Sequence, residues 1–167
     1  ITRPMPEPVL ERARKSFDVT LRQSNAPLSS NDLRHALREY DLVMPTLGDM
    51  FDAHVFEDVP RPRCKLLANF GVGYNHIDVA AAARVGVAVS NTPGAVTDAT
   101  ADTALTLMLM SARRAGEGER LVRSGQWEGW HPTQMLGLHM SGKTVGIVGM
   151  GRIGQAIAQR CFFGFGM

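Results

Sequence analysis

Short apolar runs alternate with helical patterns along most of this 167-residue chain. Each apolar run is too short for a helix and is closed by glycine, proline or polar residues, which is typical of buried strands. Strands that alternate with helices form a mainly parallel sheet with right-handed crossovers and helices on both faces. We therefore expect an α/β fold with strands in DVTLR (18–22), DLVMPTL (41–47), KLLANFG (65–71), VAVSNTP (87–93) and TVGIV (144–148).

Helical spacing predicts where the helices between these runs begin and end. Helices are expected in 6–17, 27–40 and 76–86. In the second of them Ser29, Ser30 or Asn31 can serve as the N-cap, and Leu33 and Leu37 share one face. A longer helix is expected over 97–125, and its middle, ALTLMLM, is apolar on almost all sides. Such a helix predicts burial on several sides, between two domains or at a subunit interface.

Composition and charge exclude several classes of function. The 18 basic and 16 acidic residues are scattered, so no basic stripe for nucleic acid is present. Cys64 and Cys161 stand alone, which predicts buried free thiols rather than a zinc site or a disulfide. No apolar stretch is long enough for a membrane span. We expect a cytoplasmic protein without a metal, a nucleic-acid partner or a membrane partner, and ITRP at the start suggests a fragment of a longer chain.

The stretch GIVGMGRIGQAIAQR (146–160) carries glycines in the spacing of a dinucleotide-binding turn. Such a turn must follow a strand and open a helix, as this one does. Gly149 would permit the tight turn, Gly151 the approach of a pyrophosphate, and Gly154 close packing of the helix on the strand. The helix N-terminus would supply free N–H groups, and Arg152 a positive charge. A glycine-rich turn without a ligand is the alternative.

Four stretches resemble the D-isomer-specific 2-hydroxyacid dehydrogenases, most closely their glyoxylate and hydroxypyruvate reductase branch. They are NFGVGYNHIDVAAAARVGVAVSNTPG, TDATADTALTLMLMSARR, MSGKTVGIVGMGRIGQAIA and the terminal GFGM. The resemblance implies a flavodoxin-like substrate domain over 1–98 and the start of a Rossmann cofactor domain over 99–167. The amino-acid composition also changes near Pro93, which indicates a domain boundary in this region.

The resemblance implies hydride transfer between NAD or NADP and C2 of a small 2-keto or 2-hydroxy acid. The Arg, Glu and His that carry out catalysis in the family match no position of this chain and are expected beyond residue 167. The side chain that distinguishes NAD from NADP is expected about 20 residues after the glycines, also beyond it. His76 and His131 match no catalytic position, so we interpret both as structural or solvated.

The resemblance also implies binding residues. The backbone amides of Val72 and Gly73 would hold the substrate carboxylate, although NFGVG could be a simple turn. Leu47 would close over the substrate. The cofactor would contact Thr97 together with Gly149, Gly151, Arg152, Ile153 and Gly154. The alternative is that Thr97 only caps the long helix, and it could also do both.

The apolar middle of the long helix and the aromatic loop after it predict a homodimer centred on both, since a two-fold dimer is the commonest way to cover such a helix. The resemblance implies that Trp130 would reach the substrate pocket of the neighbouring subunit, or else it would pack within its own subunit. Two functional alternatives remain open at this point. One is a dinucleotide-sensing binding protein like the corepressors of the family. The other is phosphoglycerate, formate or phosphite dehydrogenase chemistry.

Overall fold

The computed structural model describes all 167 residues of the chain. It divides into two compact units, Ile1–Ala95 and Val96–Met167, which are described separately below. The sequence places the boundary slightly further along, between residues 98 and 99.

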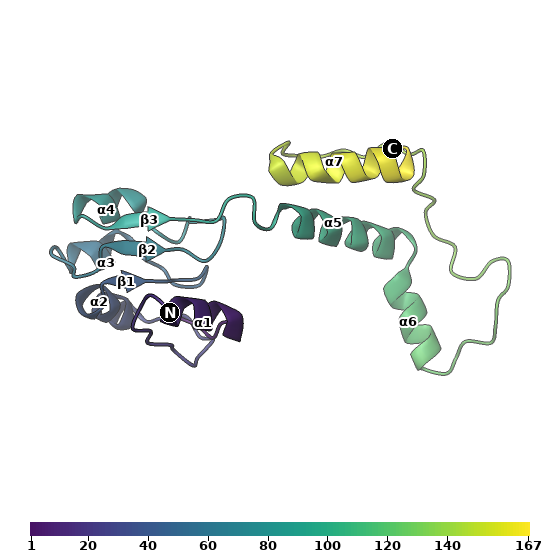
Figure 1. Ribbon diagram of the computed structural model, residues 1–167. Helices are drawn as coiled ribbons and strands as arrows, with labels where there is room; N and C mark the ends of the chain where they lie inside the picture. The colour runs from purple at the N-terminus through teal and green to yellow at the C-terminus, as the bar shows by residue number, and fades with distance from the viewer. The chain divides into compact units, whose positions relative to one another are not determined.

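Unit 1 is built on a parallel sheet. Its strands are β1 (Leu42–Val43), β2 (Leu66–Ala68) and β3 (Ala88–Ser90), which are neighbours in that order (Figure 1). All three lie within apolar runs that the sequence predicts as strands, and the parallel α/β arrangement is confirmed.

Two further segments extend this sheet beyond β1 through backbone hydrogen bonds. The Thr2 amide donates to the carbonyl of Met44 (3.1 Å), and the Arg22 amide donates to the carbonyl of Ile1 (3.0 Å). Neither segment forms a regular strand, so the strand that we expected in DVTLR is not formed, although Arg22 pairs with Ile1. The spatial order is nevertheless 20–22, 1–3, β1, β2, β3, which is the doubly wound 2-1-3-4-5 order of flavodoxin-like folds.

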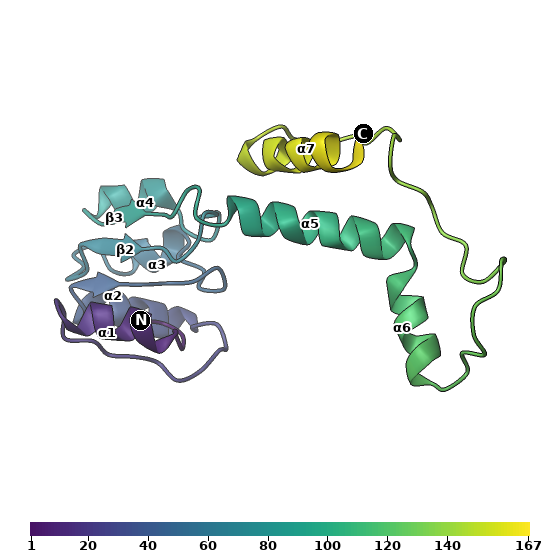
Figure 2. The ribbon, with the colours of Figure 1, turned by 45° about the vertical axis from the view of Figure 1, so that its right-hand side comes forward.

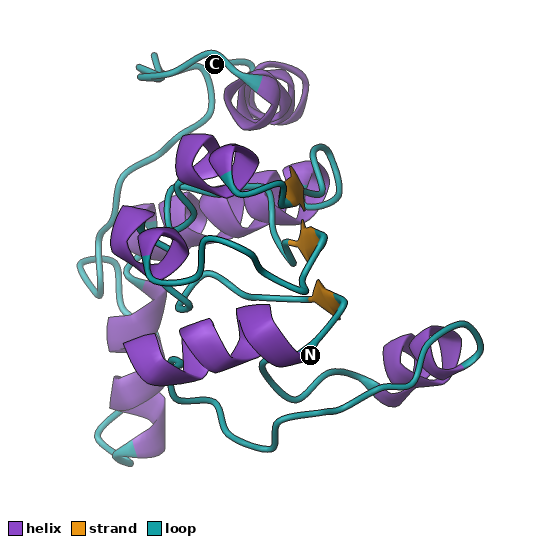
Figure 3. Cartoon of the chain, turned by 90° about the vertical axis from the view of Figure 1, so that its left-hand side faces the viewer, coloured by secondary structure: helices purple, strands orange, loops and turns teal.

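The helices of unit 1 lie on both sides of the sheet, as Figure 3 shows in a view in which the strands are seen end-on. They are α1 (Glu7–Arg14), α2 (Ser30–Glu39), α3 (Ala53–Glu57) and α4 (Val79–Arg84). Ser29 is the N-cap of α2, and its side chain forms a reciprocal capping box with Asp32. The sequence did not predict α3, a five-residue helix whose first turn is capped by Asp52.

The core of unit 1 lies between the sheet and helices α2, α3 and α4. The predicted face of α2 is buried, because Leu33 and Leu37 are 2% and 0% exposed. They pack in one cluster with Val43, Phe51, Val55, Phe56 and Leu67. Burial of these side chains, each of which contributes roughly 1.5–3 kcal/mol, fixes the strand ends that carry the loops described below.

A buried carboxylate organises the turn after β1. Asp49 is 0% exposed and accepts hydrogen bonds from the Thr2 hydroxyl (2.6 Å) and from the amides of Thr46 and Leu28 (both 3.1 Å). Arg3 pairs with it at 3.2 Å. Burial alone would raise the pKa of Asp49, but these hydrogen bonds and the Arg3 charge lower it below its usual value.

We expect the change Asp49→Ala to lower the free energy of unfolding by about 3 kcal/mol at neutral pH, because it leaves buried donors and a cation without their acceptor. A lowered pKa in the folded state stabilises the protein above the unfolded pKa, and this contribution is lost as the pH falls through the folded pKa. The difference between wild type and variant should therefore shrink below about pH 4. Urea unfolding at several pH values measures it.

The matched control is Asp58→Ala, which removes a carboxylate that is 53% exposed and pairs with Arg34 at the surface. An exposed pair contributes less than about 1 kcal/mol. Equal losses for the two variants would contradict the role that we give Asp49.

Unit 2 contains α5 (Thr97–Ala112), α6 (Ala115–Arg123) and α7 (Arg152–Phe165) (Figure 2). The prediction of one helix over 97–125 is wrong, because the chain turns between α5 and α6. Arg114 adopts a left-handed conformation there, with φ +54°. The glycines at 116 and 118 also lower the helix propensity of the segment after the turn.

Within this single chain, α5 is buried on one side only. Only Ala101 and Leu105 are buried, on the side where α7 packs, whereas Leu107 is 61% exposed. Arg160 of α7 forms ion pairs with Asp98 (3.0 Å) and Asp102 (2.7 Å) on α5.

None of the helices combines the length and the apolar character that a membrane-spanning helix needs.

The run TVGIV does not form the strand that we expected. Residues 143–147 have no regular secondary structure, and no second sheet is formed in unit 2. A strand is stabilised by pairing with a neighbour, and unit 2 offers this run none. The glycine turn that follows it is nevertheless well formed.

Candidate functional site

A loop at the carboxyl end of β2 holds the predicted carboxylate-binding amides. In open α/β sheets, ligands bind outside the carboxyl ends of the strands. The N–H groups of Gly71 and Phe70 donate to the carbonyls of Asn69 and Pro45. The N–H groups of Val72 and Gly73 donate to no acceptor in the chain. The loop therefore carries two free donors in succession, the arrangement that binds anions in backbone nests.

Leu47 lies over this loop. A Cβ atom added at Gly71 would lie 3.6 Å from the Cδ2 atom of Leu47, and one added at Gly73 would lie 3.8 Å from it. Leu47 is 62% exposed although it is apolar. The structure thus brings together Leu47, Val72 and Gly73, the predicted substrate-binding residues of unit 1, and gives the loop an apolar side.

Two asparagines and a histidine that the sequence analysis did not select as site residues hold this loop. Asn69 and His76 are buried, at 2% and 6% exposure, and are joined by a 2.9 Å hydrogen bond. Asn91 donates to the carbonyl of Val72 at 2.9 Å. The available signal was Asn69 itself, a polar residue at the end of an otherwise apolar strand.

The glycine turn before α7 has the local glycine geometry of a dinucleotide-binding turn, although the run before it forms no strand. Gly149 has φ +94°, a conformation that side chains disfavour. A Cβ atom on Gly154 would lie 2.1 Å from the carbonyl oxygen of Gly149, so this close packing requires glycine. A Cβ atom on Gly151 would meet no atom within 4 Å. The space beside Gly151 is therefore free for a ligand rather than filled by the protein.

The N-terminus of α7 is open as well. Gly151 is its N-cap and provides no side-chain capping bond. The amides of Arg152 and Ile153 donate to no backbone or side-chain acceptor, and Arg152 is exposed. Free N–H groups and the positive end of the helix dipole favour a phosphate at this point. The predicted cofactor residues Gly149, Gly151, Arg152, Ile153 and Gly154 are thus brought together.

Thr97 lies elsewhere in unit 2, as the first residue of α5. The N-cap of this helix is Val96, and no side chain forms a capping hydrogen bond. The alternative that Thr97 caps the helix is therefore wrong, and its hydroxyl is free for another role.

Trp130 lies in the loop between α6 and α7 and is 81% exposed. One of our two interpretations requires Trp130 to pack within its own subunit, and its exposure contradicts that interpretation. Trp127 differs from it, since the indole Nε1 of Trp127 donates to Gln134 at 3.3 Å. His131 is exposed and contacts Thr133, in keeping with a solvated role.

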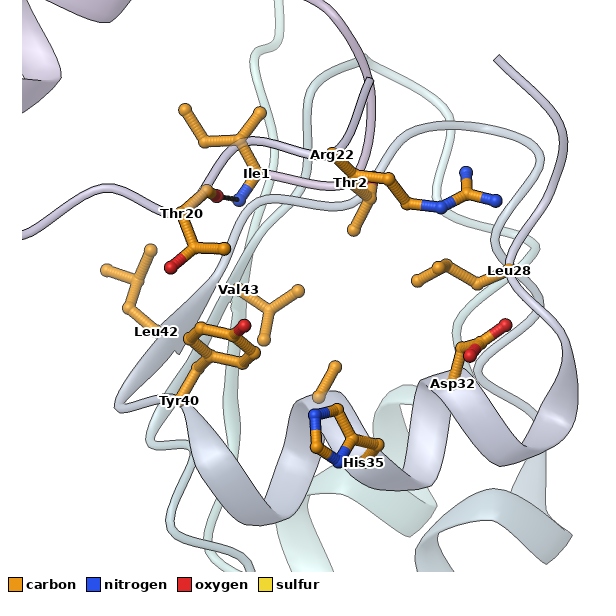
Figure 4. A pocket seen from close by; sticks show the side chains of 11 residues that line it. Ile1, Thr2, Thr20, Arg22, Leu28, Asp32, His35, Tyr40, Leu42 and Val43 are labelled. Atoms are coloured by element: carbon orange, nitrogen blue, oxygen red, sulfur yellow. Dashed lines mark hydrogen bonds between the residues drawn. The ribbon is translucent and has the colours of Figure 1, made fainter. Parts of the chain in front are cut away.

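A separate cavity of about 250 Å³ lies in unit 1 between α2 and the extended segments 1–3 and 20–22 (Figure 4). The side chains of His35 and Tyr40 line it from α2 and its C-cap, and Leu42 and Val43 line it from β1. None of the residues predicted to bind substrate or cofactor borders this cavity.

Comparisons with known proteins show which family this chain belongs to. The model of the D-isomer specific 2-hydroxyacid dehydrogenase catalytic domain matches residues 1–162. A glyoxylate reductase of Thermococcus onnurineus is 43% identical over all of this chain and 50% of its own length. A glycerate dehydrogenase of Hyphomicrobium methylovorum is 38% identical over 96% of this chain and 49% of its own.

Among solved structures, the TT0316 protein of Thermus thermophilus matches with a TM-score of 0.90 and 40% identity. The match covers 99% of this chain and 52% of that protein. The chain thus spans about half the length of the relatives that it matches.

Proposed function

Because the chain belongs to the D-isomer-specific 2-hydroxyacid dehydrogenase family, we propose that it forms part of an oxidoreductase acting on a small 2-keto or 2-hydroxy acid. The preferred substrates are glyoxylate and hydroxypyruvate, and the hydride is exchanged with NAD or NADP. The native protein, meaning the whole polypeptide in which residues 1–167 occur, carries this activity. The observation that supports the proposal is the pair of free amides on Val72 and Gly73, in one chain with an open dinucleotide turn.

The amides of Val72 and Gly73 would bind the carboxylate of the substrate. Hydrogen bonds to an ionised acceptor are roughly twice as strong as neutral ones, so two such donors fix the acid in one orientation. Leu47, which lies against the loop and is exposed, would cover the same substrate from its apolar side.

The turn from Gly149 to Gly154 would bind the pyrophosphate of the cofactor. Gly151 allows the phosphates to approach the backbone, while the amides of Arg152 and Ile153 donate to them. The Arg152 side chain adds a positive charge, and we also assign Thr97 to the cofactor. When bound, the dinucleotide supplies or accepts the hydride. We assign proton transfer to no residue of this chain.

The alternative of a non-catalytic, dinucleotide-sensing protein is not favoured, since the relatives are named as a reductase and a dehydrogenase. The buried free thiols of Cys64 and Cys161 fit the cytoplasmic location that we propose.

The test is a substrate profile of the native protein. Glyoxylate, hydroxypyruvate, phosphohydroxypyruvate, formate and phosphite are each assayed with the reduced or oxidised forms of NAD and NADP. We expect saturable oxidation of a reduced dinucleotide by glyoxylate or hydroxypyruvate. Turnover of phosphite or formate alone would support a different enzyme of the family, and no turnover by a folded, cofactor-binding protein would favour a binding protein.

We further propose that the native protein is a homodimer centred on α5 and the loop 126–143. Its apolar side chains there are exposed in the single chain, among them Leu107, Met110, Trp130, Leu136 and Leu138. An obligate interface should bury at least about 2,000 Å² in total, and a two-fold dimer is the commonest assembly.

Light scattering should show a dimer at micromolar concentration. In this dimer Trp130 reaches the substrate pocket of the neighbouring subunit, so Trp130→Ala should change the ratio of activity on hydroxypyruvate and glyoxylate. Trp127→Ala is the control, because that ring is bonded within its own loop. A monomer would contradict the dimer, and an unaltered substrate ratio would contradict the role of Trp130.

A further inference from the structure

Asn69 connects the end of β2 to the carboxylate-binding loop. Its side-chain Nδ2 donates to the carbonyls of Gly71 (3.2 Å) and Gly73 (2.8 Å). The carbonyl of Gly71 also accepts from the amide of Thr92 at 3.0 Å. Both hydrogens of the Asn69 amide are therefore used on the loop, and this fixes which atom of its side chain is the oxygen.

His76 completes the arrangement. Since the Asn69 Nδ2 faces two carbonyls, its Oδ1 faces the Nε2 of His76 at 2.9 Å and must accept a hydrogen bond from it. Burial lowers the pKa of His76, although the charge of Asp49 opposes this effect. The ring is then neutral at neutral pH, with its one hydrogen on Nε2 and directed at Asn69.

These bonds determine the direction of the free amides. In a planar trans peptide the C=O of one residue and the N–H of the next point in opposite directions. The Gly71 carbonyl is held by Asn69 and Thr92, which turns the Val72 N–H away from them. The Val72 carbonyl is held by Asn91, which likewise turns the Gly73 N–H away.

We propose that Asn69 and His76 are positioning residues for substrate binding: Asn69 holds the Gly71 and Gly73 carbonyls, which keeps the Val72 amide free for a carboxylate, while Asn91 does the same for the Gly73 amide through the Val72 carbonyl. His76 acts by orienting the Asn69 amide and does not touch the substrate. This inference rests on the proposed function. It differs from a purely structural role, in which the buried pair would stabilise unit 1 without affecting the affinity for the acid.

The first experiment compares Asn69→Leu with Asn75→Leu in the native protein. Both changes remove an uncharged amide, but Asn75 is exposed and forms no side-chain hydrogen bond. We expect Asn69→Leu to raise KM for glyoxylate and Ki for oxamate, a stable 2-keto acid analogue, about tenfold or more. KM for the dinucleotide should stay within about twofold of wild type, since the changed bonds lie on the substrate loop. Asn75→Leu should leave all three constants near their wild-type values.

The second experiment compares His76→Gln with His76→Leu. Glutamine keeps an N–H donor for Asn69, so His76→Gln should keep much of the wild-type affinity for oxamate. His76→Leu lacks this donor and should bind oxamate more weakly. A folded Asn69→Leu variant with wild-type KM and Ki, or one in which only kcat falls, would overturn the inference. Equal affinities for the two His76 variants would also overturn it.

The wild-type protein provides a test that does not depend on folding of a variant. Long-range nitrogen–proton NMR correlations of His76 should show the hydrogen on Nε2, and a hydrogen on Nδ1 would overturn the inference. A wild-type protein that turns over no 2-keto acid would instead overturn the proposed function, and the inference with it.

Discussion

The change Gly151→Val is expected to weaken binding of the nicotinamide dinucleotide to the native protein by at least about tenfold, or ~1.4 kcal/mol. No atom lies within 4 Å of the position where the new Cβ atom would stand, so the variant should fold normally. The backbone at Gly151 is extended, with φ −76° and ψ −166°, which other residues adopt readily. The side chain would occupy the space where the pyrophosphate approaches the backbone.

Titration calorimetry with the dinucleotide measures the affinity, and the melting temperature reports folding. Gly164→Val is the control. Gly164 lies in the same helix, near its other end, and a Cβ atom there would also meet nothing within 4 Å. Unchanged cofactor affinity in a well-folded Gly151→Val protein would contradict the assignment of this turn.

The substitution of valine at Gly154 should, in contrast, lower the stability of the fold. A Cβ atom there would lie 2.1 Å from the Gly149 carbonyl oxygen and 3.1 Å from its carbon, so α7 must move away from the turn. Overpacking of this kind typically costs 1–3 kcal/mol, and a contact with backbone cannot be relieved by rotating a side chain. We expect Gly154→Val to lower the free energy of unfolding by about 3 kcal/mol.

Urea unfolding followed by circular dichroism measures this loss. Gly151→Val serves here as the matched control, since it adds the same side chain three residues earlier. A Gly154→Val protein as stable as Gly151→Val would show that the close contact between Gly149 and Gly154 is not needed for the fold.

The features that the sequence predicts correctly depend on neighbouring residues. Ser29 and Asp32 form their capping box within one turn, and Leu33 and Leu37 lie on one face of α2 because of helical spacing. The short runs around Leu67 and Val89 are apolar enough to specify the strands of a parallel sheet. Gly149 has the positive φ, and Gly154 the close contact with the turn, that the glycine pattern predicts.

The features that the sequence did not reveal depend on contacts between residues far apart in the chain, or on pairing with a segment that the local pattern does not show. The left-handed turn at Arg114 was not predicted, although Gly116 and Gly118 just after it are weak helix formers. The run 144–148 has strand character, but pairing needs a second strand. The link from His76 through Asn69 to the loop arises only when the chain after β2 folds back on itself.

The most direct test of the account is an NMR titration of the native protein labelled with ¹⁵N in valine and glycine. These labels report on Val72 and Gly73 in the carboxylate-binding loop and on Gly149, Gly151 and Gly154 in the dinucleotide turn. We predict that oxamate shifts the amide signals of Val72 and Gly73, and that the dinucleotide shifts those of the three glycines. Oxamate that binds with the Val72 and Gly73 signals unmoved would contradict the central claim, because the carboxylate would then be held elsewhere.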